Sequence, residues 1–372
     1  MNAWVVASSV ISPLGFTSDE NYLKIRQQVS GLSKINDTTL SVNPFCAGHI
    51  STLNDSPTHT KFETMCKKAV EVALNKIKLD SARTLYILST TKGNIELLNT
   101  SAGNTERLAL HATAKRLAED AGFQNSLVVS NACISGVLAL IVAKRFLDSG
   151  KYDHAVVVGA DALSQFVVSG FESLHALSSE PCKPFDAERK GINLGEAAAA
   201  IVLSSKPNEL GATPSIKITG GGLSNDANHI SGPSRTGMEL GLAIRQALQE
   251  AQKSPTEIDF ISAHGTATVF NDEMEAKAFH SLGMENIPLN SLKGYFGHTL
   301  GAAGVVETIM SMHSLLNNEV LASKGFDQLG VSRPINVCKE LIKKPLTTCL
   351  KTASGFGGCN AAIILQKGSY SS

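Results

Sequence analysis

An internal repeat constrains this chain more than any other feature, because a duplicated architecture requires the two halves to fold alike. In the first half, helical patterns at 62–77, 105–120 and 137–150 alternate with strand patterns at 84–94 and 126–136. Two apolar runs, at 154–164 and 195–205, close this half. The same order returns after Lys217, at 237–252, 257–268, 272–283, 287–298, 305–316, 347–358 and 360–367. The sequence therefore predicts two copies of one unit.

The alternation of strands and helices predicts the fold class. It indicates an α/β protein with parallel sheets, right-handed crossovers and helices on both faces of each sheet. Two such units placed back to back form a five-layered α/β/α/β/α core. We expect the first unit to span residues 1–210 and the second to span 211–372, with the join near 204–215, where Pro, Gly and Ser collect.

Composition limits which binding partners and which cellular compartment we expect. The 372 residues include 33 basic and 33 acidic side chains, so no overall field attracts nucleic acid or anionic lipid, and we expect neither as a partner. The N-terminus lacks the pattern of a signal peptide, and no apolar stretch is long enough to span a bilayer. The seven cysteines are scattered and odd in number, which favours a reducing compartment, the cytoplasm, over a disulfide framework.

Three loops hold the candidates for chemistry, because sites in open α/β sheets form where the chain leaves a strand and enters a helix. Cys133 follows the strand pattern SLVVSN, and His264 follows EIDFIS. His298 lies in the loop of the second half that corresponds to the loop of Cys133. The repeat thus predicts that Cys133 and His298 meet at one pseudo-twofold centre.

Cys133 lies in NACISG, immediately ahead of a strongly apolar helical segment. A thiol at a helix N-terminus faces unpaired N–H groups and the positive end of the helix dipole, which favour the thiolate. Gly136 allows backbones to pack closely at this turn. The alternative is a buried structural cysteine, the usual fate of a lone cysteine.

His264 and His298 lie in HGTAT and in the glycine-rich KGYFGHTLGAAG. Two imidazoles near one thiol can donate hydrogen bonds to a developing oxyanion without adding a fixed full charge. Either histidine taken alone is as well explained by a structural role. The short ligand spacings of zinc sites are absent, so we predict no metal.

Other residues around the histidines allow two interpretations each. Lys293 and Glu307 are either a solvated loop charge and a helix-face carboxylate or a buried pair beside the site. The GFGG run at 355–358 is either a hairpin turn or a place where the backbone approaches a ligand closely. Thr266 and Thr268 are, in the simpler interpretation, hydroxyls that satisfy a turn.

Five motifs occur in order along the chain: NACISG, KPFDAERKGINLGE, HGTATVFND, KGYFGHTLGAAG and GFGG. With them the chain resembles the elongating β-ketoacyl-acyl-carrier-protein synthases of the thiolase superfamily, from VVASSVISPLG to GFGGCNAAIIL. The resemblance implies a thiolase-like fold. It also implies an acyltransferase that condenses malonyl-carrier, with loss of carbon dioxide, onto an acyl chain in fatty acid, polyketide or polyene biosynthesis.

The resemblance assigns catalytic roles to the three loops. It implies that Cys133 accepts the acyl group and that His264 and His298 complete a Cys-His-His set. Three charged residues are expected to support this set: Lys293, Glu307 and Asp272.

The resemblance also assigns residues that bind the substrate. Thr266 and Thr268 match the threonines that hydrogen-bond the phosphopantetheine arm, and Gly357 is expected to lie along the same path. Phe356 matches a gating residue. Its backbone N–H is expected to form an oxyanion hole with that of Cys133.

Partners and cofactors follow from the same resemblance. It implies no cofactor other than the phosphopantetheine that carries the substrates on an acyl carrier protein. A dimer is expected, either of identical chains or with a ketosynthase-like chain-length-factor homologue. Two alternatives remain open: a non-catalytic chain-length-factor-like partner, and a thioester hydrolase.

Several positions depart from the family pattern. The segment VVASSVISPLG lacks the usual Thr-Gly-Gly, and Ile134 replaces a small hydroxylic residue after the nucleophile. Val269 and Phe270 replace a Pro-small pair, and residues 47–62 look compressed. Cys359 follows GFGG rather than taking the position of the second cysteine of degradative thiolases, so we expect a small buried residue there.

Overall fold

The computed structural model describes residues 3–56, 58–75, 77–99, 105–212, 215–227 and 232–368. Eleven strands of these residues form one continuous sheet, in the order β13-β11-β10-β15-β16-β9-β1-β8-β6-β4-β5. The N-terminal half supplies β1 (Ala3–Ile11), β4 (Thr84–Ser89), β5 (Asn125–Val129), β6 (His154–Asp161) and β8 (Ala197–Ser204). The C-terminal half supplies β9 (Ile216–Asn225), β10 (Phe260–Ser262), β11 (Pro288–Asn290), β13 (Asn336–Val337), β15 (Thr348–Gly355) and β16 (Cys359–Lys367).

The strand order shows the duplication directly. Outward from the middle, the order β1-β8-β6-β4-β5 matches β9-β16-β15-β10-β11, and both series use the same pattern of parallel and antiparallel pairs. The halves join where Ala3 and Trp4 pair with Ile218 and Lys217. The expectation of parallel sheets holds for β6-β4-β5 and β15-β10-β11 but is wrong for the closing strands β8 and β16, which pair antiparallel with both of their neighbours. The boundary at residue 210 stays a prediction, and residues 213–214 of the expected join lie outside the described residues.

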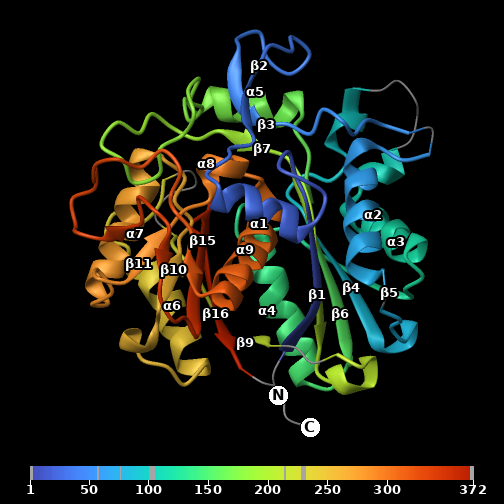
Figure 1. The fold of residues 1–372 in the computed structure, drawn as a ribbon. Coiled ribbons are helices and arrows are strands. Elements are labelled where there is room, and N and C mark those ends of the chain that lie inside the picture. Colours follow the sequence, from blue (N-terminus) through green and yellow to red (C-terminus); the bar gives the residue numbers. More distant parts are fainter. Residues whose placement is uncertain are drawn as a thin grey trace.

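The helices complete the five layers that the repeat predicts (Figure 1). The middle layer consists of α4 (Ser135–Asp148) and α9 (Ala303–Asn317), which contact strands of both halves. One outer layer consists of α2 (Lys61–Leu74) and α3 (Leu110–Asp120), and the other of α6 (Met238–Glu250) and α7 (Val269–Ser281). The thiolase-like α/β/α/β/α arrangement is therefore confirmed.

Smaller elements lie outside these layers. The helices are α1 (Ser18–Arg26), α5 (Gln165–Ser173) and α8 (Lys293–Phe296). The strands are β2 (Leu32–Ile35), β3 (Phe45–Gly48), β7 (Leu194–Gly195), β12 (Glu319–Val320) and β14 (Ile342–Lys343). β2, β3, β7, α5 and α8 gather at one end of the molecule, opposite both chain ends in Figure 1.

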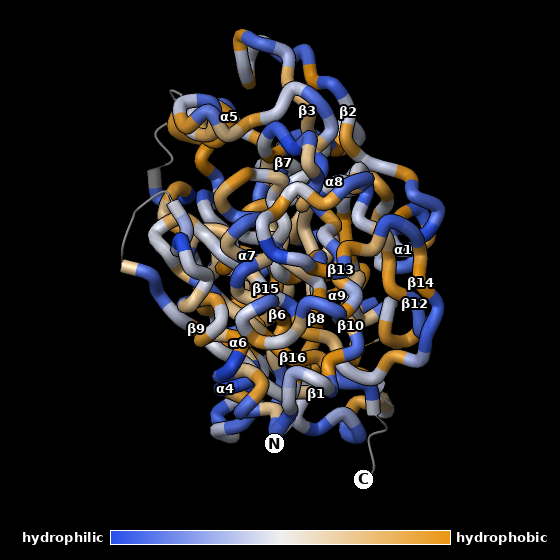
Figure 2. The backbone as a smooth tube through the Cα atoms, turned by 90° about the vertical axis from the view of Figure 1, so that its left-hand side faces the viewer, coloured by the Kyte–Doolittle hydropathy of each residue, from blue (hydrophilic) through white to orange (hydrophobic). Residues whose placement is uncertain are grey.

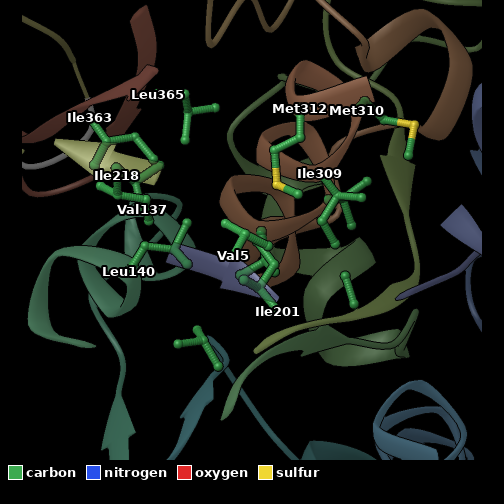
Figure 3. Packing of buried hydrophobic residues seen from close by; sticks show 14 of the residues in the cluster. Val5, Val137, Leu140, Ile201, Ile218, Ile309, Met310, Met312, Ile363 and Leu365 are labelled. Carbon is green, nitrogen blue, oxygen red and sulfur yellow. The ribbon is translucent and has the colours of Figure 1, made fainter. Parts of the chain in front are cut away.

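The middle helices are apolar on most of their surface, because sheets cover them on two sides. Val137 and Leu140 of α4 pack with Ile309 of α9 and with strand residues of both halves, such as Ile201 and Ile363 (Figure 3). Apolar backbone segments gather in the interior around β8 and β16 (Figure 2). Among the described residues, no helix has the combined length and hydrophobicity that crossing a membrane requires.

Two glycines set how closely the middle helices approach. A Cβ atom on Gly136 would lie 2.8 Å from the backbone nitrogen of Val305, and one on Gly304 would lie 2.8 Å from the carbonyl carbon of Gly136. Real Cβ atoms do not come this close to backbone, so α4 and α9 touch backbone to backbone at their first turns. This contact fixes the positions of the loops that precede both helices.

We expect Gly304→Ala to lower the free energy of unfolding by about 1–3 kcal/mol, because the added methyl group must push α4 and α9 apart. Chemical denaturation followed by circular dichroism measures the change. Gly170→Ala in α5 is the matched control, because no atom lies within 4 Å of a Cβ built there. That variant should be unchanged or slightly stabilised. A Gly304→Ala protein as stable as wild type would contradict the close helix contact.

Candidate active site

Three loops from the two halves converge at the first turns of the middle helices. Cys133 lies between β5 and α4, His264 follows β10, and His298 lies between α8 and the short 3₁₀ turn that leads into α9. One ligand atom from each of the three residues lies within 4.8 Å of the other two. The imidazole rings of His264 and His298 meet edge to face, with centroids 5.1 Å apart. The predicted meeting of these residues is therefore present in the structure.

The surroundings of His298 fix its ring. The backbone N–H of Leu300 donates to Nδ1 of His298 at 3.3 Å, so Nδ1 is an acceptor and the proton of the neutral ring is on Nε2. Among the described residues no group hydrogen-bonds to Nε2. Asn193 and Gly195 hold the backbone of His298 from both sides, at 2.7 and 3.0 Å. The motif KPFDAERKGINLGE thus positions a histidine rather than forming only a charged loop.

His264 is held mainly through its backbone. Its N–H donates to Oε1 of Glu275 at 2.8 Å, and its carbonyl accepts from Nζ of Lys293 at 3.0 Å. Glu275 lies in α7, is fully buried and also accepts the N–H of Gly265 at 2.6 Å. The sequence interpretation missed Glu275. Its spacing of three from Asp272, on one helix face directly after the HGTAT loop, was the available signal.

Lys293 and Glu307 form a buried ion pair, which decides between the two interpretations of these residues. A second buried lysine, Lys351 of β15, lies 2.6 Å from Oε2 of the same carboxylate. Burial alone would raise the pKa of Glu307, but Lys293 and Lys351 hold that pKa below its usual value. The sequence interpretation missed Lys351, although a lysine inside the apolar strand pattern TCLKTASG was a visible irregularity.

Both histidines are neutral in this environment. Burial lowers the pKa of His264 and that of His298 well below the usual value, and the charges of Lys293 and Lys351 lower both further. Three donor atoms within 4.8 Å would also suit a metal ion. The two buried ammonium groups oppose a dication, so we interpret the set without a metal.

The thiol of Cys133 is protonated at rest. Burial, with a smaller contribution from Cys359, raises its pKa to about 12, and Lys293 acts in the opposite direction. The expectation of a thiolate at the helix N-terminus is therefore wrong, because removal from water outweighs the attraction of the helix end. Any reaction at Cys133 must remove the proton as the sulfur attacks.

Asp272 supports the threonine loop and not the thiol directly. Its Oδ1 accepts the N–H of Thr266 at 3.0 Å, and its Oδ2 accepts the N–H of Phe185 at 2.7 Å. Burial raises the pKa of Asp272 to about 7. The hydroxyls of Thr266 and Thr268 lie 2.9 Å apart, so at least one of them has an acceptor position left for a ligand.

The GFGG run is both a hairpin turn and a close approach to the site. It joins β15 to β16, with Gly355 paired to Cys359. A Cβ atom on Gly355 would lie 3.0 Å from the backbone nitrogen of Cys133. Phe356 is 41% exposed, and its ring lies 5.7 Å from the ring of Phe171 in α5. Gly357 has φ of +84° and no atom within 4 Å of a Cβ built there, so it faces open space.

A groove with a volume of about 250 Å³ opens beside Cys133. It lies between the start of α4, the end of β9 and the start of β16, and its lining includes Asn131, Ile134, Leu138, Leu223 and Cys359. Two of these residues flank Cys133 in the sequence. Ile134 is buried there, whereas Val269 and Phe270, the other departures from the family pattern, are 56% and 75% exposed at the start of α7.

Comparison with known proteins identifies the family of the chain. The N-terminal domain model of β-ketoacyl synthases matches residues 99–208, and the C-terminal domain model matches residues 216–327. The two models together match more than half of the chain, which belongs to the β-ketoacyl synthase family. Similar proteins include a 3-oxoacyl-[acyl-carrier-protein] synthase and a putative polyketide β-ketoacyl synthase.

Curated relatives include nodulation protein E of Rhizobium leguminosarum bv. trifolii, 31% identical over 245 residues (64% of this chain and 61% of the relative). 3-Oxoacyl-[acyl-carrier-protein] synthase 2 of Rhizobium meliloti is 32% identical over 253 residues (64% and 60%). A putative polyketide β-ketoacyl synthase of Streptomyces halstedii is 30% identical over 266 residues (68% and 63%). The chain thus spans less than two thirds of the length of each of these relatives.

Solved structures extend the similarity over almost the whole chain. A chain of the solved complex between the ketosynthase ApeO and its chain length factor ApeC, from Xenorhabdus doucetiae, has a TM-score of 0.85 at 26% identity, and the match covers 99% of this chain and 98% of that one. A β-ketoacyl synthase from Burkholderia phymatum STM815 has a TM-score of 0.88 at 22% identity, covering 99% of both chains. The second likeness supports the fold alone.

The raised pKa of Cys133 predicts how its reactivity depends on pH. Only the thiolate is alkylated, so the rate of modification by iodoacetamide should rise about tenfold per pH unit between roughly pH 7 and 9, without a plateau. Mass spectrometry of the peptide that contains Cys133 measures this rate. A plateau that begins below pH 8 would show that the helix end and Lys293 outweigh burial.

Proposed function

We propose that this protein is an elongating 3-oxoacyl-[acyl-carrier-protein] synthase, which condenses malonyl-carrier with an acyl chain held on Cys133. The observation that carries the proposal is the gathering of the Cys133 thiol and the rings of His264 and His298 within 4.8 Å. One nucleophile and two neutral donors are what this reaction requires. No cofactor besides the carrier's phosphopantetheine takes part.

In the first half-reaction, the sulfur of Cys133 attacks the carbonyl carbon of the acyl-carrier thioester. The thiol proton is transferred to the pantetheine sulfur, which leaves as a thiol. The tetrahedral oxyanion accepts hydrogen bonds from the backbone N–H groups of Cys133 and Phe356. The close approach of Gly355 to the nitrogen of Cys133 supports this arrangement.

In the second half-reaction, malonyl-carrier loses carbon dioxide, and the electron pair of the broken bond forms an enolate. The Nε2–H of His298 and the ring of His264 stabilise the enolate oxygen by hydrogen bonds. Preorganised donors of this kind act strongly in a buried site. The enolate carbon then attacks the acyl-Cys133 thioester, and the thiolate of Cys133 leaves and takes up one proton from solvent. The product is a 3-oxoacyl chain two carbons longer.

The carrier arm and the partner chain complete the proposal. Thr266, Thr268 and Gly357 line the path of the phosphopantetheine, with Phe356 as its gate. The relatives named above include acyl-carrier-protein synthases, and ApeO was solved with a chain length factor, which supports a carrier as substrate and a dimer as the assembly. A chain-length-factor-like role without catalysis is opposed by the complete set of Cys133, His264 and His298. A thioester hydrolase would release free acid instead of a 3-oxoacyl product.

Replacement of Cys133 tests the nucleophile. Wild-type protein mixed with acyl-carrier should gain the mass of the acyl group, and Cys133→Ala should not, because the acceptor sulfur is gone. Intact-mass spectrometry measures the adduct. Cys359→Ala is the matched control, because it removes a neighbouring buried thiol and should leave the adduct in place. Acylation of the Cys133→Ala protein would remove the proposal.

Replacement of His298 separates the half-reactions. We expect His298→Ala to slow decarboxylation of malonyl-carrier by about 10²–10³, because a preorganised donor to the enolate is lost. Acylation of Cys133 should slow less. Release of carbon dioxide and growth of the acyl mass measure the two steps. An equal loss in both would contradict the assignment of His298 to the enolate.

A further inference from the structure

Lys351 is a fully buried lysine, and its ammonium group has no contact with solvent. It lies on β15, and its Nζ approaches four oxygen atoms. One is Oε2 of Glu307 at 2.6 Å, and the others are backbone carbonyls of Ser262 at 3.3 Å, Ala263 at 3.2 Å and Thr352 at 2.7 Å. A buried ammonium group is costly unless such partners surround it.

Two of these four oxygen atoms, the carbonyls of Ser262 and Ala263, belong to the segment that carries a catalytic histidine. Ser262 ends β10, and Ala263 immediately precedes His264. The next carbonyl along the chain, that of His264, accepts from Lys293. Two lysines thus fix three consecutive carbonyl groups, and both are joined to the single carboxylate of Glu307 on α9.

The hydroxyl of the next residue on β15 continues this network. Thr352 donates from Oγ1 to Oε1 of Glu275 at 3.1 Å, the oxygen that also accepts the N–H of His264. The strand segment at Lys351 and Thr352 therefore holds the peptide group that leads into His264, through the carbonyl of Ala263 and, by way of Glu275, the N–H of His264. Neither residue contacts a position that the substrate would occupy, so their action on the reaction is indirect.

The charge of Lys351 acts on both imidazole rings. Charged and titratable groups face the two histidines from six elements: Cys133 before α4, Asp161 at the end of β6, Glu275 of α7, Lys293 of α8, Glu307 of α9 and Lys351 of β15. Glu307 is shared by two ammonium groups. Removing one of the two would leave the rings easier to protonate, because a like charge nearby disfavours imidazolium.

We propose that Lys351 is a positioning residue for the condensation: it orients the loop of His264 and, with Lys293, keeps His264 and His298 in the neutral form that donates to the enolate. This inference rests on the proposed function. It goes beyond that function in assigning to a second buried lysine a charge-dependent role.

A matched control comes from a buried lysine away from the site. Lys144 of α4 is 5% exposed and lies 2.6 Å from the carboxylates of both Asp148 and Glu250. None of these contacts reaches the histidines. Lys144→Met therefore removes a buried lysine charge without touching the site.

The test compares Lys351→Met, Lys351→Gln and Lys351→Arg with wild type and with Lys144→Met. We expect decarboxylation of malonyl-carrier to fall about 10-fold to 100-fold in the Met and Gln variants, as for other groups that orient catalytic side chains indirectly. The acidic limb of the rate profile should move to higher pH in both, because imidazolium forms more easily. Lys351→Arg, which keeps the charge, and Lys144→Met should keep the limb of wild type.

A measurement without turnover accompanies the kinetics. In protein with ¹³C-labelled histidine, the NMR signals of His264 and His298 should titrate at higher pH in Lys351→Gln than in wild type. An unchanged titration and an unchanged acidic limb in Lys351→Gln would overturn the inference, whether or not Lys351→Met folds. If wild type fails to condense acyl chains, the proposed function is lost, and the histidine titration still decides the role of Lys351.

Discussion

The packing of two helices between two sheets determines the rest of this structure. α4 and α9 are covered by strands of both halves, so their side chains are apolar over most of the surface and their backbones meet at Gly136 and Gly304. The first turns of both helices are held at that contact. Because Cys133 precedes one helix and His298 precedes the other, the packing of the core sets the distance between thiol and imidazole.

Around that contact, the protein places charges where apolar packing would be cheaper. Glu307, Lys293 and Lys351 are buried within the core, although a buried ion pair is often no more stable than hydrophobic residues of the same volume. The groups hold carbonyls of the His264 loop and keep both rings uncharged. Burying these charges lowers the stability of the fold, but it fixes the His264 loop and the neutral form of both imidazoles.

Much of the architecture follows from the sequence, because the repeat and the alternation of elements are periodic signals. They predict the five layers and the meeting of Cys133 with His298. The antiparallel return of β8 and β16 was not predicted, since fully buried strands show the same apolar runs in either direction. The protonated thiol was also not predicted, because the pKa of Cys133 depends on how deeply the sulfur is buried. Lys351 and Glu275 were missed for a related reason: several of their partners are backbone groups of the His264 loop, which no side-chain motif records.

The division of the reactive groups between the halves has a consequence of its own. The thiol belongs to the N-terminal half and both imidazoles to the C-terminal half, and in the part of the chain that the structure describes the strands of the two halves are joined by a short ladder between β1 and β9. Neither half carries a complete set. A small shift of one half against the other would therefore change the distance from the thiol to the imidazoles while leaving the fold of each half intact. The reactivity of the Cys133 thiol therefore reports the relative position of the two halves.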